Sequence, residues 1–165
     1  GPKVGQAVVR HPIIQAVGFT GSRAGGSALM EIAARREQPI PVFAEMSSIN
    51  PVIFLKGALA RGEKALVEAF FGSLTLGVGQ FCTNPGLVFL EEGSGDAFLT
   101  MLKDLVEASS AGLMLHAGSC ENYKKTTEAT AAANGVEILA ACKTHVEADE
   151  AAPVVFQVDI EDFIA

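Results

Sequence analysis

The sequence predicts an α/β fold, in which short strands alternate with helices along the chain. Apolar runs of strand length, several of them rich in β-branched residues, recur along the sequence. Between them lie stretches whose apolar residues repeat at helical spacing, and Gly, Pro or Asn separates the two kinds of segment. With 165 residues, 49% of them hydrophobic, the chain is large enough to bury a core. This alternation is typical of α/β proteins.

The first strand, turn and helix are expected between residues 16 and 36. Residues 16–20 form an apolar strand that runs into the turn Gly21-Ser22. Apolar residues at helical spacing then predict a helix within residues 27–36, which ends before Pro39. A second strand follows over residues 42–45.

A turn at Asn50-Pro51 follows the second strand and is the expected internal boundary of the chain. Beyond it, a helix over residues 62–76 leads into a glycine-rich loop that contains Cys82. The remaining expected elements are strands over residues 52–55, 86–90, 136–140 and 154–158, and helices over residues 98–106 and 121–133.

Charge and hydropathy exclude two classes of partner. Twelve Lys and Arg stand against nineteen Asp and Glu, and the basic residues are scattered, so we expect no nucleic-acid binding. No apolar run reaches the length of a membrane span, and the first residues lack the pattern of a signal peptide, so we expect no membrane partner.

The cysteines and histidines indicate neither a zinc site nor a disulfide scaffold. Cys82, Cys120 and Cys142 include no Cys-x-x-Cys pair, and the three histidines lack the short spacing of metal ligands. We therefore expect no metal and a reducing, cytoplasmic location. Cys120 and Cys142 are interpreted as structural or simply exposed thiols.

Cys82 is the candidate nucleophile. It lies in the loop Gly79-Gln80-Phe81-Cys82-Thr83-Asn84-Pro85-Gly86, where glycines allow close backbone approach and backbone N–H groups can hold an oxyanion. A thiol in such a place can attack a carbonyl carbon. The alternative is that Cys82 is a small buried hydrophobe, as many cysteines are.

Two further features are candidates only in combination with Cys82. Glu45 ends an apolar strand, where partial burial would raise its pKa towards that of a general base; the alternative is a carboxylate that points into solvent. The turn Gly21-Ser22 between strand and helix places backbone N–H groups towards an anion, but an ordinary tight turn has the same pattern.

The order of these pieces resembles the aldehyde dehydrogenase superfamily. The chain contains Gly18-Phe19-Thr20-Gly21-Ser22, then Glu45 and Asn50-Pro51, then Gly79-Gln80-Phe81-Cys82. Residues 49–51 and 80–86 are most similar to the branch that oxidises α-ketoglutarate semialdehyde or, with NADP, fatty aldehydes.

The resemblance implies a cofactor, a substrate class and two domains. Residues 1–50 would be the C-terminal part of a Rossmann-like dinucleotide-binding domain, and residues 51–165 an incomplete catalytic domain. Cys82 would form a thiohemiacetal and a thioester with a small aldehyde, and Glu45 would be the base. Gly21, Ser22 and Met46 would contact NAD or NADP. The longer protein would be a homo-oligomer, a dimer or a tetramer.

One departure from the family and two other functions remain in view. The family continues Leu-Gly-Gly after the glutamate, whereas this chain has Met46-Ser47-Ser48, which adds side chains near the cofactor. We expect the chain to be a central segment of a longer protein and inactive alone. The alternatives are a cysteine thioesterase or acyltransferase without hydride transfer, and a non-catalytic α/β binding domain.

Overall fold

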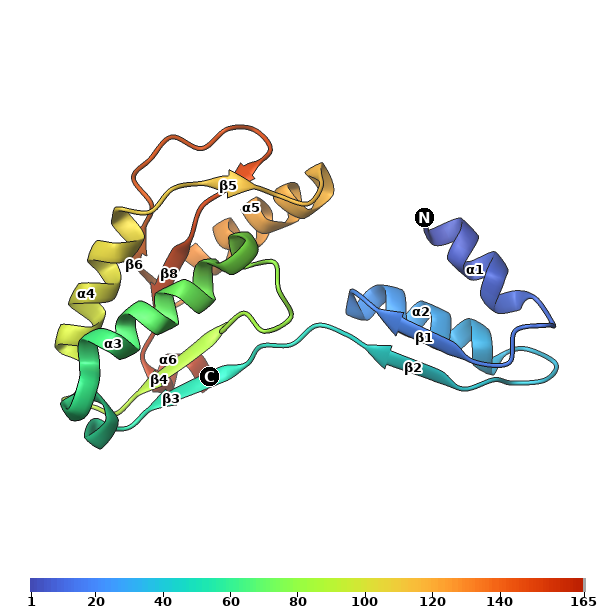
Figure 1. Cartoon of the computed structure of the whole chain (residues 1–165), viewed down its shortest axis with the longest axis horizontal. Coiled ribbons are helices and arrows are strands. Elements are labelled where there is room, and N and C mark those ends of the chain that lie inside the picture. The colour runs from blue at the N-terminus through green and yellow to red at the C-terminus, as the bar shows by residue number, and fades with distance from the viewer. Residues whose placement is uncertain (165) are drawn as a thin grey trace. The chain divides into compact units, whose positions relative to one another are not determined.

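The chain divides into two compact units, each described here by itself. The computed structural model describes residues 1–164, and the units are Gly1–Ser48 and Ile49–Ala165 (Figure 1). Asn50 and Pro51 thus both belong to the second unit. That the units are a cofactor domain and a catalytic domain stays a prediction.

The first unit is a βαβ unit with one additional helix. Its elements are α1 (Pro2–Arg10), β1 (Val17–Thr20), α2 (Arg23–Ala34) and β2 (Val42–Glu45). The strands pair in parallel and place Thr20 opposite Glu45, so α2 is the crossover between them.

Helix α1 was not expected, because it contains valines and a glycine, which have low helix propensity. Val9 is its buried residue, and α1 lies against α2. The Arg36 guanidinium then holds the end of α1 by donating to the carbonyl oxygens of Val9, Pro12 and Ile14. Tertiary contacts therefore override the weak local preference of this segment.

The second unit begins with another parallel βαβ unit and adds two antiparallel pairs. Strands β3 (Pro51–Phe54) and β4 (Leu87–Leu90) are parallel and are connected through α3 (Lys56–Thr75) and the 3₁₀ turn η1 (Leu76–Gly79). The rest comprises α4 (Asp96–Glu107), β5 (Gly112–Leu113), α5 (Ala117–Ala131), β6 (Glu137–Ala141), β7 (Glu150–Ala151), β8 (Val154–Gln157) and α6 (Ile160–Ile164), with β5 paired to β7 and β6 to β8.

The predicted α/β class is confirmed, whereas several boundaries differ from the expected ones. Helix α3 begins at Lys56, and Gly62, the expected first residue, is instead a kink with φ −173° and ψ 43° inside it. Helix α5 begins at Ala117 because the His116 ring caps it, so Cys120 lies within the helix and not before it. Strands β5 and β7 are two residues long and too short to show a periodicity.

Three phenylalanines form the centre of the second unit's core. The ring centroid of Phe54, from β3, lies 4.7 Å from that of Phe98 on α4, and that of Phe70, on α3, lies 6.0 Å from both. Phe98 is fully buried. The cluster also contains Leu59, Val67, Leu102, Val106 and Ala140. The cluster therefore packs α3 and α4 against β3 and β6.

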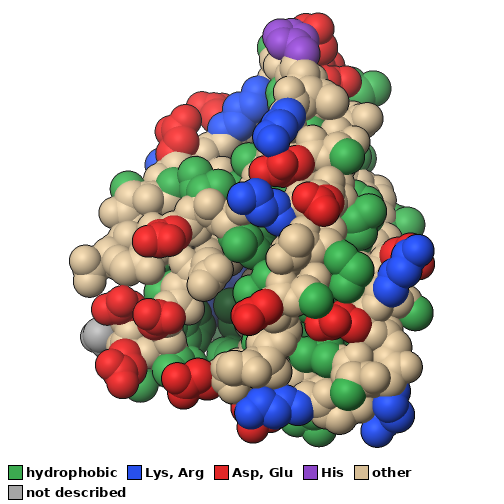
Figure 2. Space-filling model, turned by 90° about the vertical axis from the view of Figure 1, so that its left-hand side faces the viewer, with side chains coloured by type: hydrophobic (Ala, Val, Ile, Leu, Met, Phe, Trp, Pro, Cys, Tyr) green, Lys and Arg blue, Asp and Glu red, His purple; other side chains and the backbone are tan. Residues whose placement is uncertain are grey.

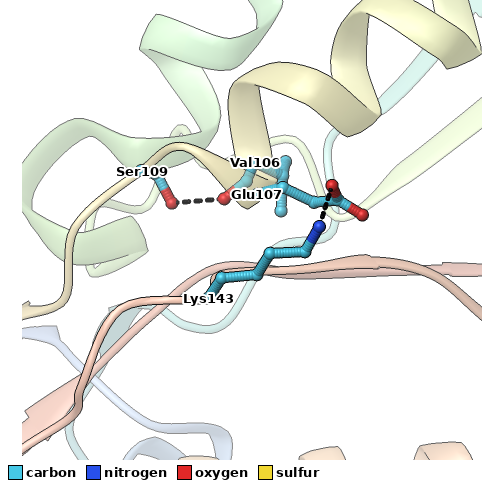
Figure 3. Close-up of polar contacts among 4 residues, drawn as sticks. All are labelled: Val106, Glu107, Ser109 and Lys143. Atoms are coloured by element: carbon cyan, nitrogen blue, oxygen red, sulfur yellow. Dashed lines mark hydrogen bonds and ion pairs between the residues drawn. The ribbon is translucent and has the colours of Figure 1, made fainter.

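One ion pair attaches the end of α4 to the segment after β6, and a local hydrogen bond closes the helix end. The Lys143 ammonium lies 2.6 Å from a Glu107 carboxylate oxygen, and the Ser109 hydroxyl donates to the Val106 carbonyl oxygen (Figure 3). The hydrogen bond from Lys143 lowers the pKa of the Glu107 carboxyl below its ordinary value. The pair thus favours the ionised form of Glu107.

Charged side chains of both signs lie on the face drawn in Figure 2, and Asp and Glu gather at its lower left. On the face in Figure 2, Lys and Arg side chains lie among Asp and Glu side chains, with hydrophobic side chains between them. Among residues 1–164, no helix has the length and apolar character needed to cross a membrane.

Candidate active site

The turn between β1 and α2 is held by a helix cap. The Ser22 hydroxyl accepts a hydrogen bond from the Gly25 N–H at 3.2 Å, which caps α2. The first turn of α2 has Arg23 and no acidic residue, so its positive end can receive an anion.

Strand pairing brings Glu45 to the same edge as this turn. Because Thr20 lies opposite Glu45, both strands end at the same level, and the Gly21 N–H donates to the Glu45 carbonyl oxygen at 3.1 Å. The carboxyl ends of parallel strands are a common place for ligands. The first unit thus brings together Gly21, Ser22 and Glu45.

Met46 lies against α2 and explains a glycine in that helix. A Cβ atom at Gly26 would be 2.5 Å from the Met46 sulfur and 3.3 Å from the ring of Phe19. A Cβ atom at Gly21 would be 2.8 Å from the same ring. A Cβ atom at either position would force the Phe19 or Met46 side chain to shift, so glycine permits the close approach seen here.

The Glu45 side chain itself is exposed. The partial burial expected at this strand end is not found in the structure. The carboxylate is accessible to water, as a base that activates water must be. The burial on which the prediction of a general base rested is absent at this residue.

Cys82 lies in the second unit and is exposed, which disagrees with the alternative that it is a packed hydrophobe. The loop before it turns sharply, because Gly77, Val78 and Gly79 all have positive φ, between 57° and 69°. For a β-branched residue such as Val78 this conformation is strained. Strained backbone is frequent beside functional residues.

Three side-chain amides hold the Cys82 loop. Gln80 donates to the Gly77 carbonyl oxygen at 2.9 Å and accepts from the Leu115 N–H at 2.8 Å. Asn84 donates to the Leu74 carbonyl oxygen at 2.7 Å. Asn50 donates to the carbonyl oxygens of both Cys82, at 2.7 Å, and Asn84, at 2.9 Å. Sequence reasoning gave these amides no role of their own, since their partners lie up to 35 residues away.

The other two cysteines differ from each other. Cys120 is buried in α5, and its thiol donates to the Glu150 carbonyl oxygen at 3.2 Å, so it is structural. Cys142 is half-buried and its thiol lies 2.9 Å from the Thr144 hydroxyl. Burial acts to raise the pKa of the Cys142 thiol, but the hydrogen bonds with Thr144 and Ser109 outweigh it and lower that pKa.

A cavity of about 990 Å³ lies between α1 and α2 of the first unit. It is lined by both polar and apolar side chains, among them Gln6, Arg10, Ala28, Ile32 and Arg35. The same helix, α2, is the one capped by Ser22 at its N-terminus. Within residues 1–164, no group of three or more His, Cys, Asp or Glu side chains could hold a metal ion.

Two curated relatives match almost the whole chain. It is 45% identical over 166 residues to alpha-ketoglutaric semialdehyde dehydrogenase 2 of Azospirillum brasilense, covering 100% of the chain and 32% of that protein. It is 42% identical over 161 residues to alpha-ketoglutaric semialdehyde dehydrogenase of Acinetobacter baylyi, covering 96% of the chain and 30% of that protein. The chain thus spans about a third of the length of these relatives.

The fold agrees with this similarity. An NAD-dependent benzaldehyde dehydrogenase from Corynebacterium glutamicum has a solved structure that superposes with a TM-score of 0.79 at 22% identity, covering 94% of this chain and 35% of that one. The family model described as "Aldehyde dehydrogenase family" matches residues 1–151. The chain belongs to the aldehyde dehydrogenase family.

Proposed function

We propose that this chain carries the nucleophile and the general base of an enzyme that oxidises an aldehyde to a carboxylic acid with NAD or NADP. The observation that carries the proposal is the exposed Cys82, held in its loop by Gln80, Asn84 and Asn50. The names of both curated relatives favour α-ketoglutarate semialdehyde as the substrate.

Cys82 forms the covalent intermediate. Its thiolate sulfur bonds to the aldehyde carbon, and the carbonyl oxygen becomes the oxyanion of a thiohemiacetal. The Cys82 backbone N–H donates to that oxyanion. When bound, the nicotinamide cofactor supplies the acceptor for the hydride whose loss converts the thiohemiacetal into a thioester.

Glu45 acts on water. Its carboxylate takes a proton as the water oxygen bonds to the thioester carbon, and the carbon–sulfur bond then breaks. The products are a carboxylic acid and the Cys82 thiolate, ready for another aldehyde. The exposure of Glu45 supports this role, because the group must reach a water molecule.

Gly21, Ser22 and Met46 are the proposed cofactor residues, and the first unit fits that group. The N-terminus of α2 has N–H groups and Arg23 for a pyrophosphate, and glycine at position 21 keeps the turn narrow. Met46, packed on Gly26, follows Glu45 directly and so lies at the same strand end. NAD and NADP share the pyrophosphate and nicotinamide that these residues would meet.

The chain can be tested inside a complete relative. In alpha-ketoglutaric semialdehyde dehydrogenase 2 of Azospirillum brasilense, the matching third is replaced by this chain, and reduction of NAD and NADP is followed with the semialdehyde. We expect turnover, and we expect Cys82→Ser to lower kcat by about 10³-fold or more. Glu45→Gln should lower kcat by about 10²–10⁴-fold with cofactor affinity retained.

Cys142→Ser is the matched control, because it makes the same change at the thiol with the lowered pKa. We expect it to leave kcat within about twofold, because Cys142 lies outside the Cys82 loop and a serine hydroxyl can keep the contacts with Ser109 and Thr144. Full activity of the Cys82→Ser variant would contradict the assignment of Cys82 as the nucleophile. Hydrolysis of a thioester without any reduction of NAD or NADP would replace the proposal with a thioesterase. The chain alone, which is a third of the relative's length, should reduce neither cofactor.

A further inference from the structure

We propose that Asn50 is a positioning residue for Cys82, whose side-chain amide sets the orientation of the Cys82 backbone N–H towards the oxyanion. The inference rests on the proposed function, since it deepens the role given to Cys82. It concerns only contacts within the second unit.

Asn50 reaches the loop because of the register between β3 and β4. Pro51 lies opposite Leu87, so the residues that precede the two parallel strands are also neighbours. The Gly86 N–H donates to the Ile49 carbonyl oxygen at 2.7 Å and closes this junction. A Cβ atom at Gly86 would be 2.9 Å from the same oxygen, so the approach is close.

The tip of the loop is a four-residue turn with Cys82 at its second position. The Asn84 N–H donates to the Phe81 carbonyl oxygen at 3.1 Å. That carbonyl shares a planar peptide group with the Cys82 N–H, so this hydrogen bond fixes the direction of the N–H. Any movement of Asn84 is therefore transmitted to the donor that faces the oxyanion.

Asn50 fixes this turn from outside. Its amide nitrogen donates to the carbonyl oxygens of Cys82 and Asn84, at 2.7 Å and 2.9 Å. A side-chain amide has two N–H donors, one for each carbonyl. The hydrogen bond from Asn84 to Phe81 holds the peptide group before Cys82. The two hydrogen bonds from Asn50 hold the peptide groups that follow Cys82 and Asn84.

The backbone of Asn50 shows why this residue type suits the position. Its φ is 50°, in the left-handed region that Asn, Asp and Gly adopt more readily than other residues. Asn50→Asp keeps this preference and the shape of the side chain but removes the donors. Asn50→Gly keeps the backbone conformation and adds no charge.

Two reagents separate positioning of the N–H from access to the thiol. The Cys82 thiolate attacks p-nitrophenyl acetate through a tetrahedral oxyanion; the carbon–sulfur bond forms, the ester carbon–oxygen bond breaks and p-nitrophenolate leaves. With iodoacetamide a carbon–sulfur bond forms, iodide leaves and no oxyanion arises. The ratio of the two rates at Cys82 therefore reports the oxyanion donor, because the thiolate fraction cancels.

The rates are measured on the 165-residue chain by mass spectrometry of each cysteine peptide. We expect both Asn50 variants to lower the acetylation-to-alkylation ratio at Cys82 by about tenfold, part of the 10²–10³-fold effect of losing one oxyanion donor. The ratio at Cys142 should not change. Asn122→Asp, the same substitution on the exposed face of α5, is the control and should leave both ratios unchanged.

An unchanged ratio at Cys82 in both Asn50 variants would overturn the inference. Labelling of the buried Cys120 together with a lowered ratio would also overturn it, because Asn50 would then act on folding. These results are separate from the proposed function. If dehydrogenase activity survives Cys82→Ser, the assignment of Cys82 as the nucleophile is wrong. If Cys82→Ser abolishes activity but the Asn50 variants leave the ratio at Cys82 unchanged, only the role of Asn50 is wrong.

Discussion

The two units hold their candidate functional residues in opposite ways. In the first unit, Gly21 and Gly26 let Phe19 and Met46 approach the backbone, and any added Cβ atom would meet them. In the second, side-chain amides reach across the loop to carbonyl oxygens, and an aromatic cluster lies in the core. Substitutions that add atoms should therefore disturb the first unit most, and substitutions that remove side-chain atoms should disturb the second unit most.

The largest expected effect is the loss of a core ring in the second unit. Phe98→Ala removes a fully buried side chain and should lower the free energy of unfolding of that unit by about 3–5 kcal/mol. Hydrogen exchange measured separately for residues 1–48 and 49–164 would show the loss in the second range only. The matched control is Phe43→Ala in the first unit, where the ring is 70% exposed and little change is expected. Equal losses from both substitutions would contradict the assignment of Phe98 to the core of the second unit.

A smaller effect is expected from an added methyl group in the first unit. Gly26→Ala should destabilise this unit by up to about 2 kcal/mol, because the clash of the new methyl with the Met46 side chain exceeds the gain of about 1 kcal/mol in helix propensity. Adding Met46→Ala should restore most of the loss, as measured by thermal unfolding. Gly5→Ala in α1 is the control, since a Cβ atom there would have no other side chain within 4 Å and alanine favours a helix. Destabilisation by Gly5→Ala of the same size would argue against the steric cause.

The smallest effect concerns pH and the contact at the end of α4. The pKa of Glu107 is lowered in the folded chain, so its pairing with Lys143 stabilises the fold above the unfolded pKa of about 4.3. That contribution is lost as pH falls through the lower, folded pKa. Glu107→Gln should therefore weaken the dependence of the free energy of unfolding on pH as pH falls below the unfolded pKa of Glu107. The control is Glu68→Gln, whose carboxylate lies 3.9 Å from Lys64 in an exposed pair and contributes little.

The sequence was most informative where structure is local. The helix after Gly21-Ser22 was expected within residues 27–36 from the spacing of its apolar residues, and the Ser22 cap makes it begin earlier, at Arg23. Helix α3 shows the limit of this reasoning, because Gly62 interrupts the helical spacing of the apolar residues. The helical residues 56–61, which precede Gly62, were therefore not predicted. Helix α1 and the short strands β5 and β7 were missed, because contacts distant in sequence stabilise them.

By itself, the sequence determined the α/β class, the family and the identity of the candidate residues Cys82, Glu45, Gly21, Ser22 and Met46. The class follows from the alternation of apolar patterns, whereas the candidate residues follow from the resemblance of their order to that of the family. Only the tertiary structure showed that Cys82 is exposed whereas Cys120 is buried, and that Asn50 bridges two carbonyls more than thirty residues away. The physical reason is that such contacts depend on which strands pair and in which register, and periodicity along one strand does not specify its partner.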